Sequence, residues 1–334
     1  MGSPIRVLMI TSEWPTEERP DYAPFIVRQA NFLRSAGLRV DVFPFQGSKK
    51  PFTYLRAWFQ IRKKLRQGSY DLVHAQWGQS GLLAIPKYCP LVVTFRGSDL
   101  EGIVDSKGQY TFAGNVLKFL SKAIALVADE IIVLSESLGS RLPKGCKYHL
   151  IPSGLDLGLF YPTSKMKARE ALALDENRRL VLFGGRPEVP VKRYNLAQQA
   201  LALLAGQWNI DLVVCQKVPH HVMPLYMNAC DVLLLTSLHE GSPDIIKEAL
   251  ACNLPIVSVD VGDVRERISG ISGCILCNDD RPTTIAAGLV EVLSRKMPIN
   301  SRDAVKDLDE GVLTKEVIGV YHHAMQRKRW KRST

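Results

Sequence analysis

The hydrophobic positions of the first half of the chain alternate between short apolar runs and longer stretches of helical spacing. One helical stretch, at residues 24–36, ends at Gly37, a typical helix terminator. Because strands separated by helices need crossover connections, this pattern predicts a doubly wound parallel α/β sheet. The apolar runs have the length of buried strands and lie at residues 5–10, 39–43, 71–74, 91–94 and 130–134.

The alternation stops in a Gly- and Pro-bearing connector at residues 153–162 and then starts again. The second series predicts strands at residues 180–183, 211–215, 232–235 and 255–259, with a helix at 196–205 and another that carries Glu248. We therefore expect two Rossmann-like domains, residues 1–158 and 159–311, with a helix at about 312–330 that packs back onto the first. Ligands bind at the carboxyl ends of parallel strands, so a central cleft between the domains is the expected site.

Composition narrows the class of protein. The chain has 334 residues, 46% of them apolar, which suffices for two packed cores and excludes disorder. Its seven scattered cysteines are typical of a reducing cytoplasm. Cys274 and Cys277 form a single CxxC without a second ligand pair, so no zinc site is expected. The longest apolar stretch, residues 123–134, contains Asp129 and Glu130 and is too short to span a membrane.

The net charge of +10 is concentrated in the first half of the chain. Lys49 begins and Arg66 ends a cluster with seven basic residues and no acidic one. The cluster predicts peripheral contact with an anionic membrane at its cytoplasmic face. The alternative is a core-packing helix with a solvated basic face. A third interpretation, binding to nucleic acid, is not supported by any nucleic-acid-binding motif. Apolar, aromatic and basic residues recur there at near-helical spacing, at Leu55, Trp58, Phe59, Arg62 and Leu65.

Two acids, Glu240 and Glu248, enclose the most informative segment, Glu-Gly-Ser-Pro-Asp-Ile-Ile-Lys-Glu. It follows an apolar run, and Pro243 suits the first turn of a helix. At about 100° per residue, Asp244 and Glu248 share one side of that helix, so Glu248 is expected to point out of the core. The opposite side gathers Ile245, Ile246, Ala249 and Leu250.

The start of this helix is suited to bind an anion. Its unpaired N–H groups and the positive end of its dipole favour a phosphate against residues 242–246. Glu240 and Glu248 would then accept hydrogen bonds from hydroxyls on either side of the phosphate. This arrangement fits a nucleotide sugar; the alternative is an ordinary strand-to-helix turn with surface acids.

The order and spacing of several segments resemble the retaining family 4 glycosyltransferases, which have the GT-B fold. The resemblance extends over nearly the whole chain. It implies an acceptor side in the first domain and a nucleotide-sugar donor side in the second. The segments that carry it are Ile-Pro-Ser-Gly-Leu-Asp from residue 151, Phe-Gly-Gly-Arg from 183, Pro-Val-Lys-Arg from 190, Tyr-Met-Asn-Ala-Cys-Asp-Val from 226 and the run from Glu240 to Glu248.

The resemblance also implies roles for individual residues. Arg186 and Lys192 match the cationic pair that holds the donor diphosphate, which makes a metal cofactor unnecessary. Glu240 matches the residue that contacts the donor sugar, and Glu248 the residue that contacts the ribose. The donor-binding set that it implies is Gly185, Gly241, Ser242, Pro243, Asp244, Ile245 and Glu248.

The first domain departs from the family pattern at Arg96, where many relatives have a histidine. An arginine cannot act as a base because its pKa stays above about 12. We hypothesise that Arg96 pairs with a carboxylate or phosphate of a substrate; the alternative is that it pairs with Asp99 and shapes the loop. His74 and Asp99 are acceptor-side candidates, and structural roles are open for both.

The expected activity is transfer of a hexosyl group from a nucleoside diphosphate sugar to an acceptor hydroxyl, with retention of configuration. A UDP-sugar is favoured over a GDP-sugar, and the product would belong to a cell-surface polysaccharide or glycolipid. In such enzymes an oxygen of the leaving group takes the acceptor proton, so no base is expected. Two alternatives are a GT-B nucleotide-sugar epimerase and a noncatalytic module that binds an acidic glycan or a membrane.

Overall fold

The computed structural model describes residues 3–19, 22–45, 51–105, 107–215, 218–295 and 299–333, with the side chains of 51 and 327–333 left out. The chain divides into two compact units. Unit 1 comprises Met1–Ile103, Tyr110–Gly154 and Glu310–Thr334, and unit 2 comprises Val104–Gln109 and Leu155–Asp309. The boundaries therefore fall at residues 154 and 309, and the C-terminal helix belongs to unit 1.

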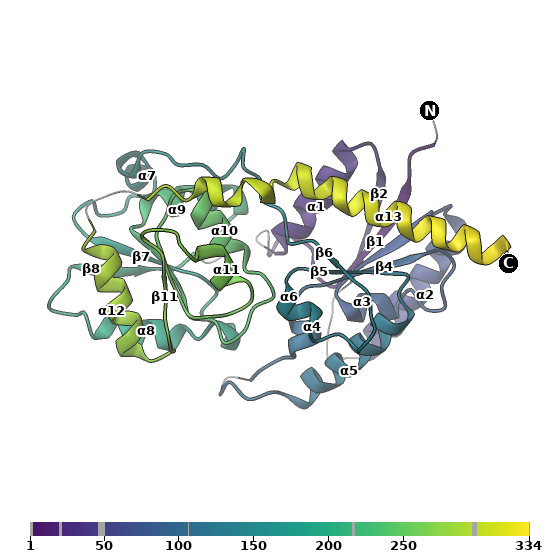
Figure 1. Cartoon of the computed structure of the whole chain (residues 1–334), viewed down its shortest axis with the longest axis horizontal. Helices are drawn as coiled ribbons and strands as arrows, with labels where there is room; N and C mark the ends of the chain where they lie inside the picture. Colours follow the sequence, from purple (N-terminus) through teal and green to yellow (C-terminus); the bar gives the residue numbers. More distant parts are fainter. Residues whose placement is uncertain are drawn as a thin grey trace. The chain divides into compact units, whose positions relative to one another are not determined.

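Unit 1 is built on a six-stranded parallel sheet with the strand order β2-β1-β3-β4-β5-β6 (Figure 1). Every residue of β3, β4 and β5 is buried, as expected for a parallel sheet with both faces covered. The strands are β1 (Arg6–Thr11), β2 (Arg39–Pro44), β3 (Leu72–Gln76), β4 (Leu91–Phe95), β5 (Glu130–Val133) and β6 (His149–Leu150).

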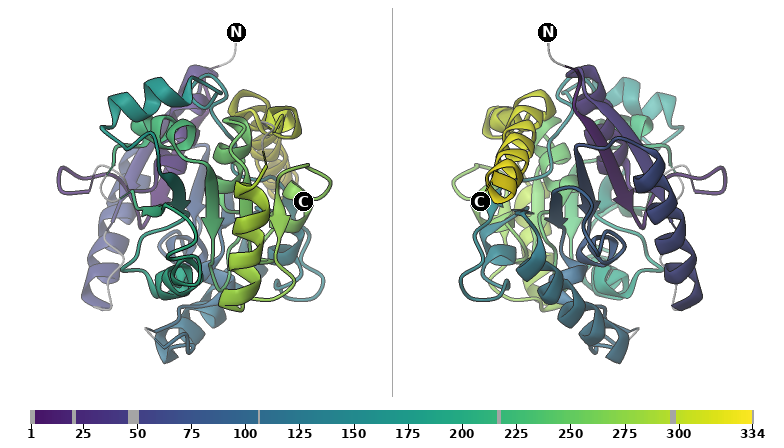
Figure 2. Two further views of the ribbon diagram at one scale, coloured as in Figure 1. Left: turned by 90° about the vertical axis from the view of Figure 1, so that its left-hand side faces the viewer. Right: turned by 90° about the vertical axis from the view of Figure 1, so that its right-hand side faces the viewer.

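The helices of unit 1 include one from the far end of the sequence. That helix, α13, packs against α1 and against β3, β4 and β5 (Figures 1 and 2). The helices are α1 (Pro24–Ser35), α2 (Pro51–Gln67), α3 (Gly78–Leu82), α4 (Ser98–Glu101), α5 (Phe112–Val127), α6 (Glu136–Gly139) and α13 (Glu310–Ser333).

A buried ion pair joins α1 to the start of α13. Arg28 Nε donates to Glu310 Oε2 over 3.0 Å, and the two side chains are 7% and 4% exposed. The same guanidinium donates to the carbonyl of Gly154. Gly154 must lack a side chain because a Cβ there would collide with the Glu310 carboxylate. This cluster fixes the C-terminal helix to unit 1.

Unit 2 contains a five-stranded parallel sheet with the order β11-β10-β9-β7-β8. Its strands are β7 (Arg179–Phe183), β8 (Ile210–Val213), β9 (Val232–Leu235), β10 (Ile256–Ser258) and β11 (Ile275–Leu276). Its helices are α7 (Lys165–Ala171), α8 (Tyr194–Ala202), α9 (Met223–Ala229), α10 (Asp244–Ala251), α11 (Val264–Ile268) and α12 (Pro282–Leu293), with 3-10 turns η1 (Pro190–Lys192), η2 (His220–Val222) and η3 (Arg302–Leu308).

The predicted fold is confirmed: both units are doubly wound parallel α/β sheets, and each strand predicted from the apolar runs is present with its ends displaced by at most two residues. The helix predicted at residues 196–205 begins and ends slightly earlier, as α8. Among the described residues, no helix is both long and apolar enough to cross a membrane.

Candidate active site

The residues of the predicted donor site gather at the carboxyl ends of β7 and β9. These strands are neighbours, with Phe183 opposite Leu234. Gly184 and Gly185 follow β7, and Gly184 N–H donates to the carbonyl of Leu234 over 2.8 Å. The segment after β9 leads to Glu240. Sheet pairing thus brings together two loops more than 40 residues apart in the sequence.

Lys192 and Glu240 form the centre of this cluster. Lys192 Nζ lies 2.5 Å from Glu240 Oε1, and the side chains are 24% and 16% exposed. Gly185 makes the contact feasible because a Cβ at this position would lie 2.8 Å from Lys192 Cγ. The lysine chain therefore crosses the bare backbone of Gly185 on its way to the glutamate. Arg186 follows directly and is partly exposed.

Arg193 and Thr236 fix the lysine-bearing turn η1 to the end of β9. Arg193 Nε donates to the carbonyl of Thr236 over 2.6 Å, and Thr236 Oγ1 donates to the carbonyl of Lys192 over 2.9 Å. The sequence reasoning did not assign a role to either residue. For Arg193, a role could have been inferred from its position in the Pro-Val-Lys-Arg segment, which carries the family resemblance. Both act on Lys192 through the backbone.

The turn after Glu240 is supported by the loop that follows β10. Ser242 Oγ donates to Asp263 Oδ2 over 2.8 Å, and Arg267 Nε donates to the same oxygen over 3.1 Å. Gly262 has a φ of +58°, and a Cβ there would lie 3.0 Å from the carbonyl oxygens of Glu240 and Gly241. The sequence reasoning missed this loop, whose only local signal is the Val-Gly-Asp sequence at 261–263.

Helix α10 begins one residue later than predicted. Pro243 is the residue before the first turn, with φ −69° and ψ 115°, so Asp244 is the first helical residue. Pro243 is thus extended rather than helical, which corrects the expectation. Asp244 Oδ1 accepts from Lys247 Nζ over 3.1 Å, and Ile245 is partly buried. The helix has no side-chain cap hydrogen bond, which leaves its N-terminal turn to backbone groups.

Glu248 does not point into solvent as its helical register suggested. Its side chain is 6% exposed and lies 2.7 Å from His220 Nε2. The reason is that α10 packs against α9, α11 and η3, which leaves little of its surface exposed. The ring centroid of Phe160 lies 5.2 Å from that of His220, so the histidine is itself packed against an aromatic ring. His220 is a neighbour of Glu248 that the sequence reasoning missed.

In unit 1, Arg96 is held by neutral side chains. Its Nε donates to Gln76 Oε1 over 2.8 Å, and its Nη1 donates to Ser153 Oγ over 3.1 Å. Its Cζ lies 4.6 Å from the ring centroid of Phe25, a cation–π distance. The adjacent cavity in unit 1 measures only about 10 Å³, the space of one water.

Asp99 is fully buried and organises the loop after β4. Its carboxylate accepts from three backbone N–H groups, those of Arg96 (3.2 Å), Gly97 (3.0 Å) and Gly78 (3.0 Å). Burial raises the pKa of this carboxyl, and the N–H donors partly offset the rise. The contacts are those of a loop-shaping residue.

His74 is also fully buried. Its Nδ1 is hydrogen-bonded to Tyr321 Oη and its Nε2 to Thr94 Oγ1, both over 2.7 Å. Burial, together with the charge of Arg96, lowers the pKa of His74 to about 3, so the ring is neutral at physiological pH. This geometry favours a structural role, because both ring nitrogens are engaged with β4 and α13.

Comparison with known families agrees with this geometry. A model described as Glycosyltransferase Family 4 matches residues 3–159, and a model described as Glycosyl transferases group 1 matches residues 165–295. This chain is a glycosyltransferase of the GT-B, family 4 type. The family resemblance stated from the motifs is thereby confirmed.

Individual relatives of this glycosyltransferase are distant. TuaC of Bacillus subtilis, named as a teichuronic acid biosynthesis glycosyltransferase, is 25% identical over 327 residues, covering 78% of this chain and 82% of TuaC. The sucrose-phosphate synthase structure from Thermosynechococcus elongatus superposes with a TM-score of 0.74 at 17% identity, covering 98% of both chains. The structure of HepE from Anabaena in complex with UDP-glucose superposes with a TM-score of 0.69 at 15% identity, covering 95% of this chain and 99% of HepE.

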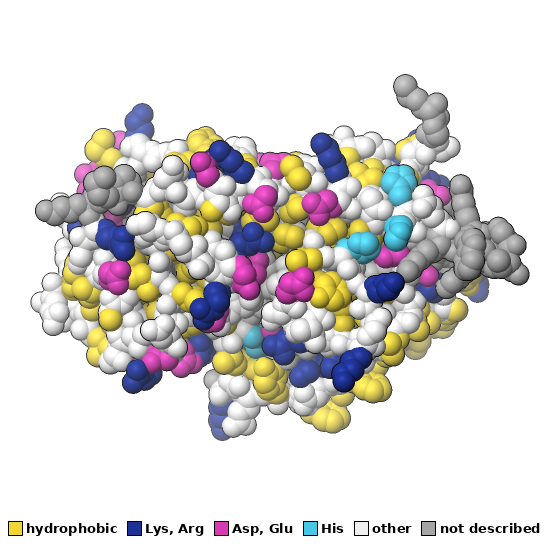
Figure 3. Space-filling view, viewed as in Figure 1, with side chains coloured by type: hydrophobic (Ala, Val, Ile, Leu, Met, Phe, Trp, Pro, Cys, Tyr) yellow, Lys and Arg dark blue, Asp and Glu magenta, His cyan; other side chains and the backbone are white. Residues whose placement is uncertain are grey.

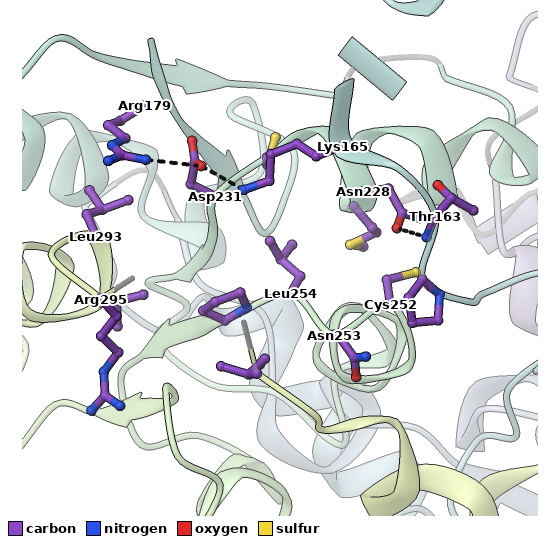
Figure 4. Close-up of a pocket in the computed structure, with 16 residues that line it drawn as sticks. Thr163, Lys165, Arg179, Asn228, Asp231, Cys252, Asn253, Leu254, Leu293 and Arg295 are labelled. Carbon is purple, nitrogen blue, oxygen red and sulfur yellow. Dashed lines mark hydrogen bonds and ion pairs between the residues drawn. The ribbon is translucent and has the colours of Figure 1, made fainter. Parts of the chain in front are cut away.

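Unit 2 of the glycosyltransferase also contains a cavity of about 460 Å³ (Figure 4). It lies at the amino ends of β7, β9 and β10, where Arg179, Asp231 and Pro255 line it, whereas the predicted donor residues lie at the carboxyl ends of the strands. Asp231 is engaged by Lys165 Nζ over 2.9 Å and by Arg169 Nη2 over 2.8 Å. The charges that line the cavity are thus already paired.

The two cysteines of the CxxC segment are free thiols. Burial raises the pKa of Cys274 and of Cys277 to about 11. Thiols with such pKa values stay protonated at neutral pH.

Proposed function

We propose that this glycosyltransferase moves a hexosyl group from a nucleoside diphosphate sugar to an acceptor hydroxyl with retention of anomeric configuration. The observation that carries the proposal is the pair formed by Lys192 and Glu240 at the carboxyl ends of β7 and β9. A cation and an acid side by side provide one group for a diphosphate and one for sugar hydroxyls. Parallel α/β sheets bind their ligands at this edge.

In the proposed reaction the bond between the anomeric carbon and the diphosphate oxygen breaks, and a bond to the acceptor oxygen forms. The acceptor proton passes to the departing phosphate oxygen, so no side chain of the chain need act as a base. Lys192 and Arg186 would offset the negative charge that develops on the leaving group. Two side-chain cations in these roles make a metal cofactor unnecessary.

We favour a UDP-sugar as donor and a cell-surface polysaccharide or glycolipid as product, made on the cytoplasmic side. The likeness to HepE, which was crystallised with UDP-glucose, supports the donor. The likeness to TuaC, named for teichuronic acid biosynthesis, supports a polysaccharide product. A GDP-sugar remains the second choice of donor.

The test is a screen for released nucleoside diphosphate with UDP-, GDP- and ADP-sugars, with and without crude lipid and polysaccharide acceptors. Release of UDP from one sugar, stimulated by acceptor, is the expected result. Formation of an epimer without UDP would identify an epimerase instead, and glycan binding without turnover would identify a binding module. The anomeric configuration of the product, read by NMR, checks retention, and full activity in EDTA checks metal independence.

We also propose that unit 1 contacts an anionic membrane, mainly through α5. This helix exposes its large apolar residues: Phe112 is 84%, Phe119 72% and Leu126 66% exposed. Its buried face carries small residues, including Gly114 and Ser121. A helix of a globular protein usually has the opposite orientation, and a contiguous exposed apolar stripe marks an interaction surface.

Glycines and small residues explain why α5 keeps this orientation. A Cβ at Gly78 would collide with Ser121 Oγ, and a Cβ at Gly114 would lie 2.5 Å from the backbone nitrogen of Ile103. The small face of α5 therefore fits closely against α3 and the segment at residue 103. A larger side chain on that face would push the helix away, so the apolar stripe stays outside.

The basic helix α2 adds charge to the same region of unit 1. Trp58 Nε1 donates to the carbonyl of Ile85, and Lys87 Nζ donates to the carbonyl of Val127, so α2 and α5 both border segment 85–88. Figure 3 shows apolar side chains along this edge with Lys and Arg beside them. Apolar insertion with basic anchoring fits an anionic lipid surface. Among the described side chains of α2, the exposed apolar and basic ones are those of Phe52, Leu55, Arg56, Phe59, Lys63 and Arg66.

The stripe predicted on α2 itself is only partly exposed. Arg62 and Leu65 are buried, and Arg62 Nη2 donates to the carbonyl of Leu83 over 3.0 Å. Trp58 is half-buried. Arg62, Leu65 and part of Trp58 therefore pack into the unit, as expected for a core-packing helix. Lys49 lies outside the described residues. The membrane proposal therefore rests more on α5 than on the segment from Lys49 to Arg66.

A further inference from the structure

Three metal-ligating side chains from distant parts of the sequence meet in unit 1. Glu130 begins β5, His149 begins β6, and His323 lies on α13. One ligand atom from each lies within 4.8 Å of the other two. Figure 3 shows histidines gathered over α13 on this face. The cluster belongs to unit 1 and involves none of the residues proposed to bind the donor.

The separations are close to those that a metal ion imposes. Glu130 Oε2 lies 2.8 Å from His149 Nε2, and Glu130 Oε1 lies 3.4 Å from His323 Nδ1. Zinc binds nitrogen and oxygen ligands at about 2.0–2.2 Å in a tetrahedron, which places its ligand atoms about 3.3 Å apart. The two distances involve different oxygens of the Glu130 carboxylate, and ligand atoms of all three side chains lie within 4.8 Å of one another, so the side chains would adjust around a shared ion.

We propose that Glu130, His149 and His323 form a site for a divalent transition metal, with zinc as the best match. Imidazole nitrogens with one carboxylate suit zinc, nickel and copper better than magnesium or calcium, which prefer oxygen ligands. The Glu130 side chain is 7% exposed, whereas those of His149 and His323 are 35% and 59% exposed. A buried carboxylate with two reachable imidazoles leaves a path for the ion and a fourth position for water.

A metal here would fasten α13 to the edge of the sheet. Two ligands come from adjacent parallel strands, which pair Ile132 with His149, and the third comes from the C-terminal helix. The ion would thus join the last helix to the body of unit 1 by coordination. Its effect would be on stability rather than on transfer chemistry.

The test is calorimetric titration of the untagged, chelator-treated chain with zinc alone. The expected result is one zinc per chain, with affinity reduced at least tenfold in His323→Ala and in His149→Ala. His322→Ala is the matched control, because His322 is an exposed histidine next to His323 on the same helix. It should leave the affinity within about twofold.

The outcome also separates a lost ligand from a lost fold. Zinc should raise the melting temperature of the wild type but not of His323→Ala, while the metal-free melting temperatures of the two stay alike because His323 is exposed. Unchanged zinc binding in a His149→Ala/His323→Ala double variant would overturn the proposal. Release of nucleoside diphosphate is measured in parallel, so failure of the donor proposal would leave the zinc result standing.

Discussion

Lys192 Nζ and Glu240 Oε1 lie 2.5 Å apart although the residues are 48 positions apart in the sequence. The contact depends on three features: the bare backbone of Gly185, the pairing of β7 with β9, and the Arg193 bridge to Thr236. Groups that are already in place lose little free energy to reorganisation when a charged ligand arrives. The pair is therefore a suitable starting point for testing the donor site.

We expect Lys192→Ala to lower kcat/KM for the best donor by about 10²–10³, the usual effect of removing one electrostatic contact to a developing anion. Binding of the free nucleoside diphosphate, measured by calorimetry, should weaken as well. Lys306→Ala is the control. Lys306 likewise forms an ion pair, with its Nζ 2.7 Å from Asp303 Oδ1, but both of these side chains are exposed. Equal effects of the two variants would contradict a donor role for Lys192.

We expect Arg96→Ala to reduce discrimination between charged and neutral sugars. If Arg96 pairs with a carboxylate, the ratio of rates with UDP-glucuronate and UDP-glucose, or the KM for an anionic acceptor, should change at least tenfold. Arg96→Lys keeps the charge without the planar fork and should restore the effect only in part. A fall in melting temperature with no change in substrate preference would show that Arg96 only holds Gln76 and Ser153.

We expect the α5 stripe to govern binding to vesicles. Burying a large apolar side chain is worth about 1.5–3 kcal/mol, so a Phe112→Ser/Phe119→Ser variant should lose most of its co-sedimentation with vesicles that contain anionic lipid. Leu203→Ser in unit 2, where Leu203 is 50% exposed, is the matched control.

Comparison of lipids completes the vesicle test. The basic residues of α2 should make binding to anionic vesicles stronger than binding to neutral ones, and salt should weaken it. Equal binding to both kinds of vesicle would contradict the proposed anionic surface. Unchanged sedimentation of the α5 variant would remove α5 from the contact.

His74 should make the stability of unit 1 depend on pH. Its folded pKa of about 3 lies below the ordinary value of 6.5, so below pH 6.5 the unfolded chain binds a proton that the folded chain does not. Stability is thus unaffected above pH 6.5 and falls as the pH drops toward 3. Between pH 6.5 and 4.5 the wild type should lose about 2 kcal/mol more than His74→Gln. Parallel pH curves from denaturant unfolding would contradict this.

Most of the fold could be predicted from local patterns. The apolar runs predicted β1 to β5 in unit 1 and β7 to β10 in unit 2, because a strand buried on both faces leaves a continuous apolar stretch in the sequence. The short strands β6 and β11, each of two residues, were missed since two residues carry no pattern. The motifs around Glu240 indicated the family by order and spacing alone.

The environment of the side chains followed less directly. The register of α10 predicted an outward Glu248, but His220 from another loop covers it. His74 was an acceptor-side candidate with a structural role as the alternative. The structure shows its Nδ1 hydrogen-bonded to Tyr321, which is 247 residues away in the sequence. Periodicity describes one element at a time, so it cannot say which neighbours cover its polar face.

The sequence by itself determined two parallel α/β sheets and the glycosyltransferase family, and it predicted the residues of a donor site, because these depend on local periodicity and motif order. Only the tertiary structure decided that Lys192 meets Glu240, that α5 turns its apolar residues outward, and that Glu130, His149 and His323 gather at one point. These relationships arise from strand order and from the close approach that glycines such as Gly78 and Gly185 permit. Such contacts are long-range, and no window of the sequence contains both partners.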